Sequence, residues 1–299
     1  MKNFNDVSLY YEQLNSQKDL KKKHHQIQTY YLKAWCNSND KLFYITETGK
    51  IAQNNAKSLG MVIDGYKANP INQEDYKYIS SIINNIQPND NMRKLCVIFE
   101  FVYHSRNNEK LNSNAIENEY CQIEEAMNPL IKIAKANFID YEIILKFKES
   151  IVRYVVHQFY RTDHAKKVFL DKWCKNDIEK EIYQRHYWFL GILLGENYLT
   201  NIKSSHIVIM NNNTDENFIT STNPVMIRNG YNRFFMPLSP KQAITIIFDD
   251  SSYNSQKVDE LSKEIVDYCN KEIYENSKSY GGCLVSKEEN DLKLFQNLV

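Results

Sequence analysis

The chain has 299 residues, of which 42% are hydrophobic and 25% are charged, and these values exclude a disordered chain as the default. Its 37 basic and 37 acidic residues cancel, which excludes a general basic coat for nucleic acid, so any such contact must be local. Tyr (21) and Phe (14) are frequent whereas Gly (8) and Pro (6) are few, which favours helices over a turn-rich β-sandwich.

Cysteine usage and hydropathy indicate a compartment. Six cysteines are scattered through the chain and form no C-x-x-C pair, which excludes the common zinc and thiol-redox motifs. The first residues hold no apolar core of a signal peptide, and the longest apolar run, Tyr187–Leu194, is too short to span a bilayer. Free cysteines without an export signal are typical of a reducing cytoplasm. We therefore expect a cytoplasmic protein with no membrane partner.

Before residue 41 the sequence predicts only short helices. Residues 1–22 are expected to form a polar leader with room for one helix, and residues 26–36 a short helix. The run Lys41–Thr46 alternates apolar and polar side chains, and Gly49 follows where a hairpin would turn, so a β-hairpin is expected here. Residues 61–88 show no clear period.

The middle of the chain shows the helical period. From residue 89 onward, apolar residues recur three or four positions apart, which predicts a series of helices. They are expected near 92–103, 116–127, 144–159, 164–174 and 177–194. Asp140 and Asn176 stand at N-cap positions, and Glu179 has the spacing of a capping box. Pro129 should start or kink a helix, and Gly195 should end the last one.

After residue 195 the pattern changes to short apolar runs that are typical of strands. These runs cover 206–210, 217–220, 243–248 and 283–286, and a helical stripe covers 256–276. The polar linker 211–215 suits an antiparallel pairing of the first two runs.

The order of these elements predicts an α+β fold. We expect a mainly helical middle and a small mixed or antiparallel sheet built from N- and C-terminal segments, with the strands of 41–52 and 205–248 in one sheet. After the leader, residues 23–299 should form a single domain, with a helical core at 89–195 and a C-terminal strand and helix part at 205–286.

Two adjacent histidines are the first candidates for chemistry. His24 and His25 follow the basic run Lys21–Lys23 and precede an aromatic cluster. Neighbouring side chains diverge on a strand or a helix, so only one of them can easily face a given pocket. A histidine here could act as a general base, bind phosphate or ligate a metal. The alternative is that both histidines cap or pack beside solvated lysines.

An acidic helix is expected around Glu119 and Glu124, with Ile116, Tyr120 and Ile123 facing the core. At helical spacing the two carboxylates flank that stripe on opposite sides, so they do not form a local pair. Either carboxylate could orient a histidine or bind a cation. The alternative is a solvated helix edge.

Arg161 lies at the end of an expected helix, four residues after His157 and on the same face. Its planar guanidinium could hold a phosphate or a carboxylate through two parallel hydrogen bonds. Equally, it could form a salt bridge with one of the two glutamates and tie the helices together.

A polar turn follows one of the expected strands. Ser221, Thr222 and Asn223 precede Pro224, so the backbone of Asn223 must be extended. These three residues offer hydroxyl and amide groups that could bind a ligand. The alternative is a turn at the edge of a sheet.

Three segments resemble the opening and closing signatures of an uncharacterised, mostly bacterial family, domain of unknown function 4238. They are Lys23–Trp35, Phe218–Val225 and Phe235–Pro240. The resemblance extends over 23–286, and it supports the architecture without naming a reaction.

Individual residues follow the family's pattern to different degrees. Tyr31, Leu32 and Lys33 match the opening well, and the paired histidine is its most recognisable part. Gln28 stands where the family usually has proline, and Thr222 stands where it usually has aspartate. If that aspartate is a metal ligand or a base in relatives, this chain lacks it.

The motifs of common enzymes do not occur. The chain contains no Walker A, G-x-G-x-x-G, H-E-x-x-H or G-x-S-x-G motif, so no cofactor is expected, although a divalent metal stays open. Histidine, arginine and lysine side chains suit phosphodiester chemistry without a cofactor. Our first hypothesis is a hydrolytic effector that acts on nucleic acid, with RNA favoured. Because members of the family often look like accessory-genome cargo, the resemblance implies, by association alone, a role in bacterial defence.

The residues assigned to this activity fall into two groups. The catalytic candidates are His24, His25, Glu119, Glu124 and Arg161, and the binding candidates are Lys23, Tyr31, Ser221, Thr222 and Asn223. A second hypothesis is a non-catalytic module that binds a ligand or a protein partner in the same polar cleft. A third is a structural protein whose histidines only pack. The sequence does not decide whether the protein is an enzyme, and it does not give the oligomeric state.

Overall fold

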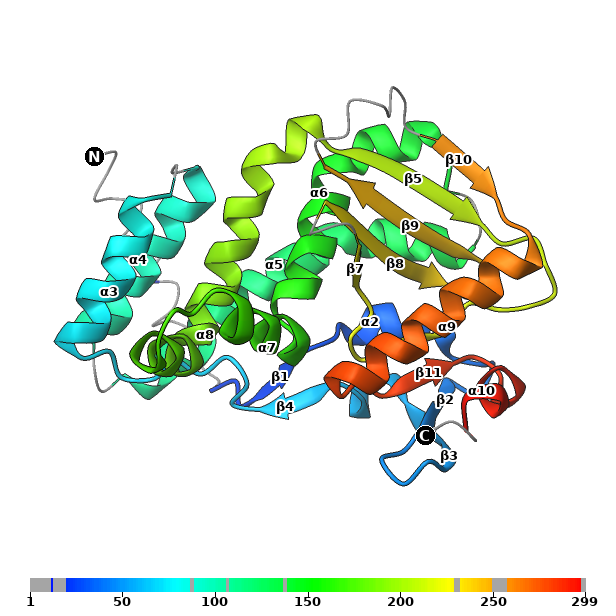
Figure 1. The fold of residues 1–299 in the computed structure, drawn as a ribbon, viewed down its shortest axis with the longest axis horizontal. Coiled ribbons are helices and arrows are strands. Elements are labelled where there is room, and N and C mark those ends of the chain that lie inside the picture. The colour runs from blue at the N-terminus through cyan, green and yellow to red at the C-terminus, as the bar shows by residue number, and fades with distance from the viewer. Residues whose placement is uncertain are drawn as a thin grey trace.

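The computed structural model describes residue 12 and residues 20–86, 89–105, 108–136, 139–228, 232–248 and 257–296 (Figure 1). The leader predicted at 1–22 therefore lies almost wholly outside the described residues.

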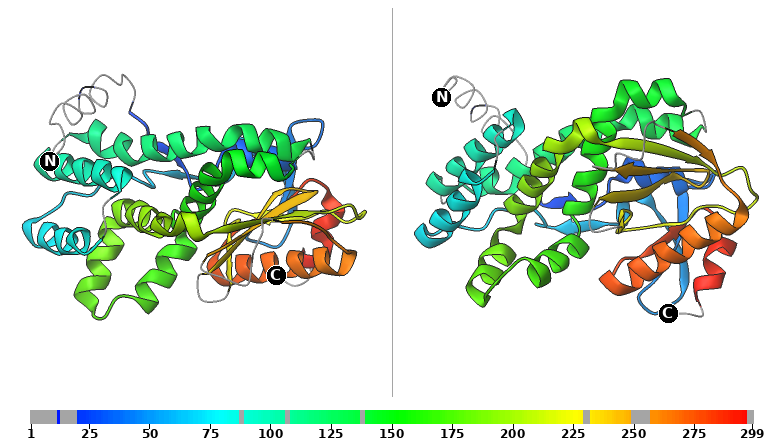
Figure 2. Two further views of the ribbon diagram at one scale, coloured as in Figure 1. Left: turned by 90° about the horizontal axis from the view of Figure 1, so that it is seen from above. Right: turned by 45° about the horizontal axis from the view of Figure 1, so that its top comes forward.

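The predicted helical middle is present. Its helices are α4 (Asp90–His104), α5 (Glu109–Lys135), α6 (Tyr141–Tyr160), α7 (Asp163–Lys172) and α8 (Asp177–Tyr198). A further helix, α3 (Gln73–Asn84), precedes them in the stretch where the sequence shows no clear period. Their apolar stripes face one another, and Phe99, Met127, Val155 and Phe189 are fully buried in one core. Figure 2 shows α7 and α8 as a helical hairpin that projects away from the sheets.

Polar side chains begin these helices. Each of the six N-cap side chains accepts a hydrogen bond from the backbone N–H of the third residue that follows. They belong to Asn72, Asn89, Asn108, Asp140, Thr162 and Asn176. The caps at Asp140 and Asn176 confirm the prediction, and they satisfy backbone donors that a helix cannot pair internally.

The sequence misplaces one helix end. α5 continues through Pro129, and α8 continues through Gly195 to Tyr198. Gly195 serves close packing instead of ending the helix, because a Cβ atom there would lie 2.6 Å from the ring of His157. α8 is interrupted at His186, whose backbone leaves the helical region (φ −114°, ψ 18°).

A five-stranded sheet packs against the helical middle. In spatial order it consists of β10 (Lys257–Glu260), β5 (His206–Asn211), β9 (Gln242–Ile247), β8 (Arg233–Ser239) and β7 (Met226–Arg228). β10 runs parallel to β5, and the other pairings are antiparallel. Figure 2 shows α5 and α6 on one face of this sheet and α9 (Lys263–Tyr280) on the other.

A second sheet joins the two ends of the chain. Its antiparallel strands, in order, are β3 (Ile51–Asn55), β2 (Lys41–Ile45), β11 (Leu284–Ser286) and β6 (Thr220–Ser221), and α10 (Glu289–Gln296) packs on β2 and β3. The predicted hairpin and the predicted α+β class, with a sheet drawn from both ends, are confirmed. β1 (Lys23–His25) and β4 (Met61–Ile63) form a separate ribbon, and α2 (Thr29–Leu32) follows β1.

The strands differ from the prediction in their pairing. Of the strands in 205–248, only β6 shares a sheet with β2 and β3. β5 does not pair with β6, because β9 and β10 occupy both of its edges. The sequence pattern did not reveal β8, since Pro237 is unusual in a central strand. A register shift beside Pro237 accommodates it.

Two clusters of buried side chains hold the layers together. The larger cluster joins the helices to one face of the five-stranded sheet through Phe234 and Ile244, and the smaller one lies under α9 with Phe235 and Ile273. Successive residues of β8 thus enter opposite clusters, as in a strand buried on both faces. None of the described helices has the length and apolar composition needed to cross a membrane.

Candidate functional site

β1 points His24 into the core. His24 Nδ1 accepts the backbone N–H of Tyr66 at 2.7 Å, so the ring proton resides on Nε2, which donates to the carbonyl oxygen of Lys21 at 3.0 Å. The ring stacks on that of Tyr66, with centroids 5.5 Å apart. Burial lowers the pKa of His24 and keeps the ring neutral. Nδ1 therefore holds the loop after β4 against β1, and Nε2 ties the ring to the segment just before β1.

His25 points to the other face of β1, as the divergence of neighbouring side chains predicts. Burial lowers the pKa of its imidazole, while the charges of Glu124 and Arg161 act on it in opposite directions. Its Nε2 atom is buried and has no hydrogen-bond partner among the described residues. Of the two histidines, His25 is therefore the one whose ring nitrogen is not engaged in holding the fold.

Arg161, the C-cap residue of α6, joins α6 to α5. Its guanidinium donates to Glu124 Oε1 of α5 at 2.6 Å and to Gln158 Oε1 at 2.7 Å, and it lies over the ring of Tyr120 at 5.3 Å. Burial alone would lower the pKa of Arg161, but the adjacent carboxylate of Glu124 outweighs burial and raises it. Arg161 thus forms the salt bridge that was one of the two predicted alternatives.

A second carboxyl group accompanies this ion pair. Glu117 lies seven residues before Glu124 on the same face of α5, and it is 8% exposed. Burial raises the pKa of Glu117 to about 7, although the charge of Arg161 opposes the shift. Two carboxyl groups therefore act on one guanidinium, and one of them takes up a proton near neutral pH.

Glu119 lies elsewhere. Its carboxylate accepts from Lys94 Nζ of α4 at 2.7 Å, on the side of α5 away from Glu124, as the helical spacing predicts. It lines a cavity of about 280 Å³ together with Arg153 and Glu196. The structure therefore does not bring Glu119 together with Arg161.

A pocket of about 240 Å³ opens beside Arg161. Its walls come from the end of β1, the loop after β4, and helices α5 to α8. The aromatic lining residues are Tyr66, Tyr120, Tyr160, Tyr187 and Trp188; the cationic ones are Lys67, Arg161, Lys166 and Arg185; the anionic ones are Asp64 and Asp163; and the amides are Gln26, Asn69 and Gln184. We call this the Arg161 pocket.

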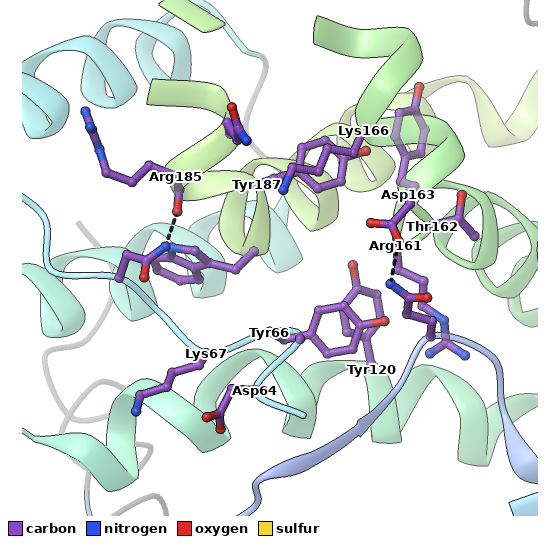
Figure 3. A pocket seen from close by; sticks show the side chains of 16 residues that line it. Asp64, Tyr66, Lys67, Tyr120, Arg161, Thr162, Asp163, Lys166, Arg185 and Tyr187 are labelled. Atoms are coloured by element: carbon purple, nitrogen blue, oxygen red, sulfur yellow. Dashed lines mark hydrogen bonds between the residues drawn. The ribbon is translucent and has the colours of Figure 1, made fainter. Parts of the chain in front are cut away.

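Lys166 of α7 and Tyr187 of α8 both line the Arg161 pocket and lie in its upper part in Figure 3. Arg161 is tied to Glu124, Arg185 to Asp75, and Lys67 to Glu109. The ammonium group of Lys166 has no ion-pair or hydrogen-bond partner in the described part of the chain. Lys166 is therefore the cation of this pocket that is most readily available to a ligand.

Two nitrogen atoms in the wall have no partner. Nε of Arg161 and Nε1 of Trp188 are buried, and neither has a hydrogen bond to any described residue. Buried donors are normally satisfied, and here two that lack a partner among the described residues belong to side chains that line the same pocket.

Ser221, Thr222 and Asn223 lie in a different region, beside the end of α9. Ser221 Oγ accepts the backbone N–H of Asn223 at 3.1 Å, and Thr222 Oγ1 accepts the backbone N–H of Cys283 at 2.9 Å. Asn223 Nδ2 reaches the carbonyl oxygen of Tyr280 at 3.5 Å. The three polar side chains thus shape the junction of β6 with β11.

A second cavity, of about 790 Å³, lies at this junction and is called the Thr222 cavity below. Tyr44, Ile45, Tyr274 and Leu284 give it an apolar lining, and it shares no lining residue with the Arg161 pocket.

The two remaining binding candidates are also apart from the Arg161 pocket. Tyr31 is fully buried, and its hydroxyl group bonds to Thr220 Oγ1 at 2.6 Å and donates to the carbonyl oxygen of Pro237 at 2.8 Å. Lys23 is exposed on β1. Tyr31 thus connects the family's opening segment to its two later segments.

Residues 23–280 match the family described as proteins of unknown function, DUF4238. The match covers most of the chain and includes all ten predicted site residues. The chain belongs to the DUF4238 family. No significant match occurs among curated proteins or solved structures.

Membership in DUF4238 fixes no reaction for this family member. Sequence reasoning missed Glu117, Lys166, Tyr187 and Trp188. Glu117 had a signal, because it shares a helical face with Glu124. The other three had none, because only the packing of α7 against α8 brings them beside Arg161.

The described part of this DUF4238 chain contains no preformed cluster of metal-ligating side chains. No group of three or more His, Cys, Asp or Glu side chains is placed there to hold a metal ion. The six cysteines are all free thiols. Burial raises the pKa of Cys283 to about 12 and that of Cys121 to about 11, so both thiols are protonated at neutral pH.

Proposed function

We propose that this protein binds single-stranded nucleic acid, with RNA favoured, by holding one unstacked nucleotide in the Arg161 pocket. The observation that carries the proposal is the composition of the lining: aromatic rings, amides and an unpartnered lysine meet in one small concave site. Aromatic faces stack on bases, amides bond to base edges and ribose hydroxyls, and cations hold phosphate. At about 240 Å³ the pocket suits one nucleotide unit better than a larger ligand.

The half-buried ring of Tyr187 and the ammonium of Lys166 are the contacts assigned to the ligand. Tyr187 is the most accessible aromatic side chain of the lining, because Tyr66, Tyr120, Tyr160 and Trp188 are each at most 5% exposed. Tyr187 and Lys166 line the same pocket of about 240 Å³ (Figure 3), so a base on the ring would have its phosphate within reach of the lysine. The neutral net charge of the chain fits this local mode of contact.

Hydrolysis is the second candidate, and one observation favours it. His25 lies in the field of Glu124 and Arg161, and its neutral ring has a nitrogen without a partner in the described structure. Such a nitrogen can act as a general base. Binding ranks first because the geometry commits His24 to the fold and Arg161 to Glu124. Ser221 and Asn223 bond locally at the β6 turn, away from both.

Fluorescence polarisation with a labelled ten-nucleotide RNA tests the binding proposal. Tyr187→Ala should cost about 1–3 kcal/mol of affinity, the usual value of one base stacked on an aromatic ring. Lys166→Ala should weaken binding and make the slope of log K against log salt shallower by about 0.7, the contribution of one phosphate contact in a single strand. Lys167→Ala, the exposed neighbour in α7, is the matched control and should change neither quantity. Equal losses in the two lysine variants would reject the pocket as the binding site.

Incubation of the same RNA, total RNA and plasmid DNA with the protein separates the two candidates. If His25 is a general base, His25→Ala should reduce cleavage about 10²–10⁴-fold. Binding without cleavage would leave recognition as the function, and absence of both would reject the two together.

A further inference from the structure

The wall that α8 gives to the Arg161 pocket contains the break at His186. Gln184 and Arg185 line the pocket before the break, and Tyr187 and Trp188 line it after the break. The backbone of His186 (φ −114°, ψ 18°) therefore sets the direction of the two aromatic side chains relative to the rest of the wall.

No proline explains this break, because α8 contains none. Instead, a side chain from outside the helix enters the backbone ladder: Asn69 Nδ2 donates to the carbonyl oxygen of Arg185 at 2.6 Å. Figure 3 shows this hydrogen bond as a dashed line at the edge of the pocket. Asn69 belongs to the loop between β4 and α3, which also lines the pocket.

Asp75, in the first turn of α3, holds both residues at the break. Its carboxylate accepts from His186 Nε2 at 2.8 Å and from Arg185 Nε and NH2 at 3.2 and 2.9 Å. Asp75 is 2% exposed and His186 is fully buried. Burial alone would raise the pKa of Asp75, but the hydrogen bonds from His186 and Arg185 outweigh it and lower that pKa, so the carboxylate is ionised.

We infer that Asp75 and His186 are positioning residues for the Arg161 pocket: they hold α8 in the broken form that places Tyr187 and Trp188 against a ligand. The inference rests on the proposed nucleotide binding and deepens it by naming what sets the affinity of the site. Neither side chain lines the pocket, so both act through α8.

The chain contains a matched pair for comparison. Glu196 of α8 is 2% exposed, as Asp75 of α3 is. Its carboxylate accepts from His157 Nε2 at 2.9 Å and from Arg153 NH1 at 2.6 Å. This is the same combination of carboxylate, histidine and arginine, but Glu196 lines a different cavity. If such groups only stabilise the fold, Asp75→Asn and Glu196→Gln should have the same consequences.

The first measurement compares affinity for the ten-nucleotide RNA at a temperature below the Tm of every variant. We expect both carboxylate variants to lower Tm. Asp75→Asn and His186→Leu should weaken binding about tenfold, a usual effect of removing an orienting partner, whereas Glu196→Gln should stay within about twofold of the wild type. His186→Gln keeps a donor toward Asp75 and should restore most of the affinity. Equal affinities in Asp75→Asn and Glu196→Gln would overturn the inference.

The second measurement does not depend on nucleic acid. Trp35 is fully buried and Trp173 is 58% exposed, so in the Trp173→Phe variant acrylamide quenching reports mainly on Trp188. Adding His186→Leu should increase quenching, and adding Glu196→Gln should not. If the wild type binds no RNA, the proposed function fails while quenching still decides the positioning role. Unchanged quenching in His186→Leu would then overturn it.

Discussion

The Arg161 pocket and the Thr222 cavity treat polar side chains in opposite ways. Beside the Thr222 cavity, the hydroxyl groups of Ser221 and Thr222 accept the backbone N–H groups of Asn223 and Cys283. At the Arg161 pocket, Arg161 is surrounded by charged and aromatic side chains, yet its Nε and the Nε1 of Trp188 have no partner among the described residues. The polar side chains beside the Thr222 cavity are satisfied by hydrogen bonds within the fold. In the Arg161 pocket, two buried donors are not satisfied by any described residue.

This difference shows that a sequence signature can mark structure as well as a site. Tyr31 of the family's opening segment bonds to Thr220 and to Pro237 of the later segments, so the three signatures meet around one buried hydroxyl group. Between the two regions, α7 meets the end of α9 where His164 stacks on Tyr280, with ring centroids 3.5 Å apart. The Arg161 pocket lies on the α7 side of that contact.

Removing Arg161 should give the largest change in stability. Arg161→Ala leaves the carboxylates of Glu124 and Glu117 without their cation, and breaking a buried pair in this way costs about 3–5 kcal/mol. Urea denaturation measures this loss. Arg161→Lys keeps the charge but loses the planar fork, so it should recover only part of the stability. A loss near zero in Arg161→Ala would mean that the guanidinium does not hold α5 to α6.

The sequence was sufficient for most of the helical middle and insufficient for the pairing of the strands. The 3.6-residue period and the caps at Asp140 and Asn176 are local signals, so they located the helical middle. Strand pairing depends on neighbours far apart in sequence, and no local signal places β10 beside β5 or β11 between β2 and β6. Gly195 misled the prediction, because contact with His157 rather than a turn requires glycine there.

The site was predicted in part for the same reason. Helical spacing placed Glu119 and Glu124 on opposite sides of α5, and β1 separated the two histidines as expected. The convergence of Arg161 with Lys166 and Tyr187 depends on how α7 and α8 pack, which the sequence pattern does not contain. Ten candidates were assigned to one polar cleft, and the structure distributes them over several places.

Neutralising Glu117 should stabilise the protein in a pH-dependent way. Its folded pKa of about 7 lies above the ordinary value of 4.5, so its favourable contribution is present below pH 4.5 and is lost as pH rises through 7. Glu117→Gln should therefore raise the unfolding free energy by about 2–3 kcal/mol at pH 8 and by little at pH 4.5. Glu125→Gln, at an exposed position of α5, is the control. A gain of equal size at both pH values would contradict the assigned pKa.

Replacing His24 should destabilise the protein more than replacing His25. His24→Ala removes two hydrogen bonds and a stacked ring and should cost about 2 kcal/mol, whereas His25→Ala should cost well under about 1 kcal/mol. Burial depresses the pKa of His24, so its contribution is present above pH 6.5 and declines as pH falls toward the lower folded value. Thermal unfolding at pH 7.5 and at pH 5 should show the difference in Tm between the wild type and His24→Ala becoming smaller at the lower pH. Equal Tm values for His24→Ala and His25→Ala at pH 7.5 would reject the structural role of His24.

Thr222→Val should have the smallest effect, and this effect should be on stability alone. Valine keeps the shape of threonine but cannot accept the backbone N–H of Cys283, so the variant loses one hydrogen bond, worth about 1 kcal/mol. RNA affinity should be unchanged, because Thr222 lines the other cavity and no residue is common to the two linings. Fluorescence polarisation and urea denaturation on the same preparation separate the two effects. If Thr222→Val weakened RNA binding as strongly as Lys166→Ala, the Thr222 cavity would belong to the binding site, and the contrast between the two regions would be wrong.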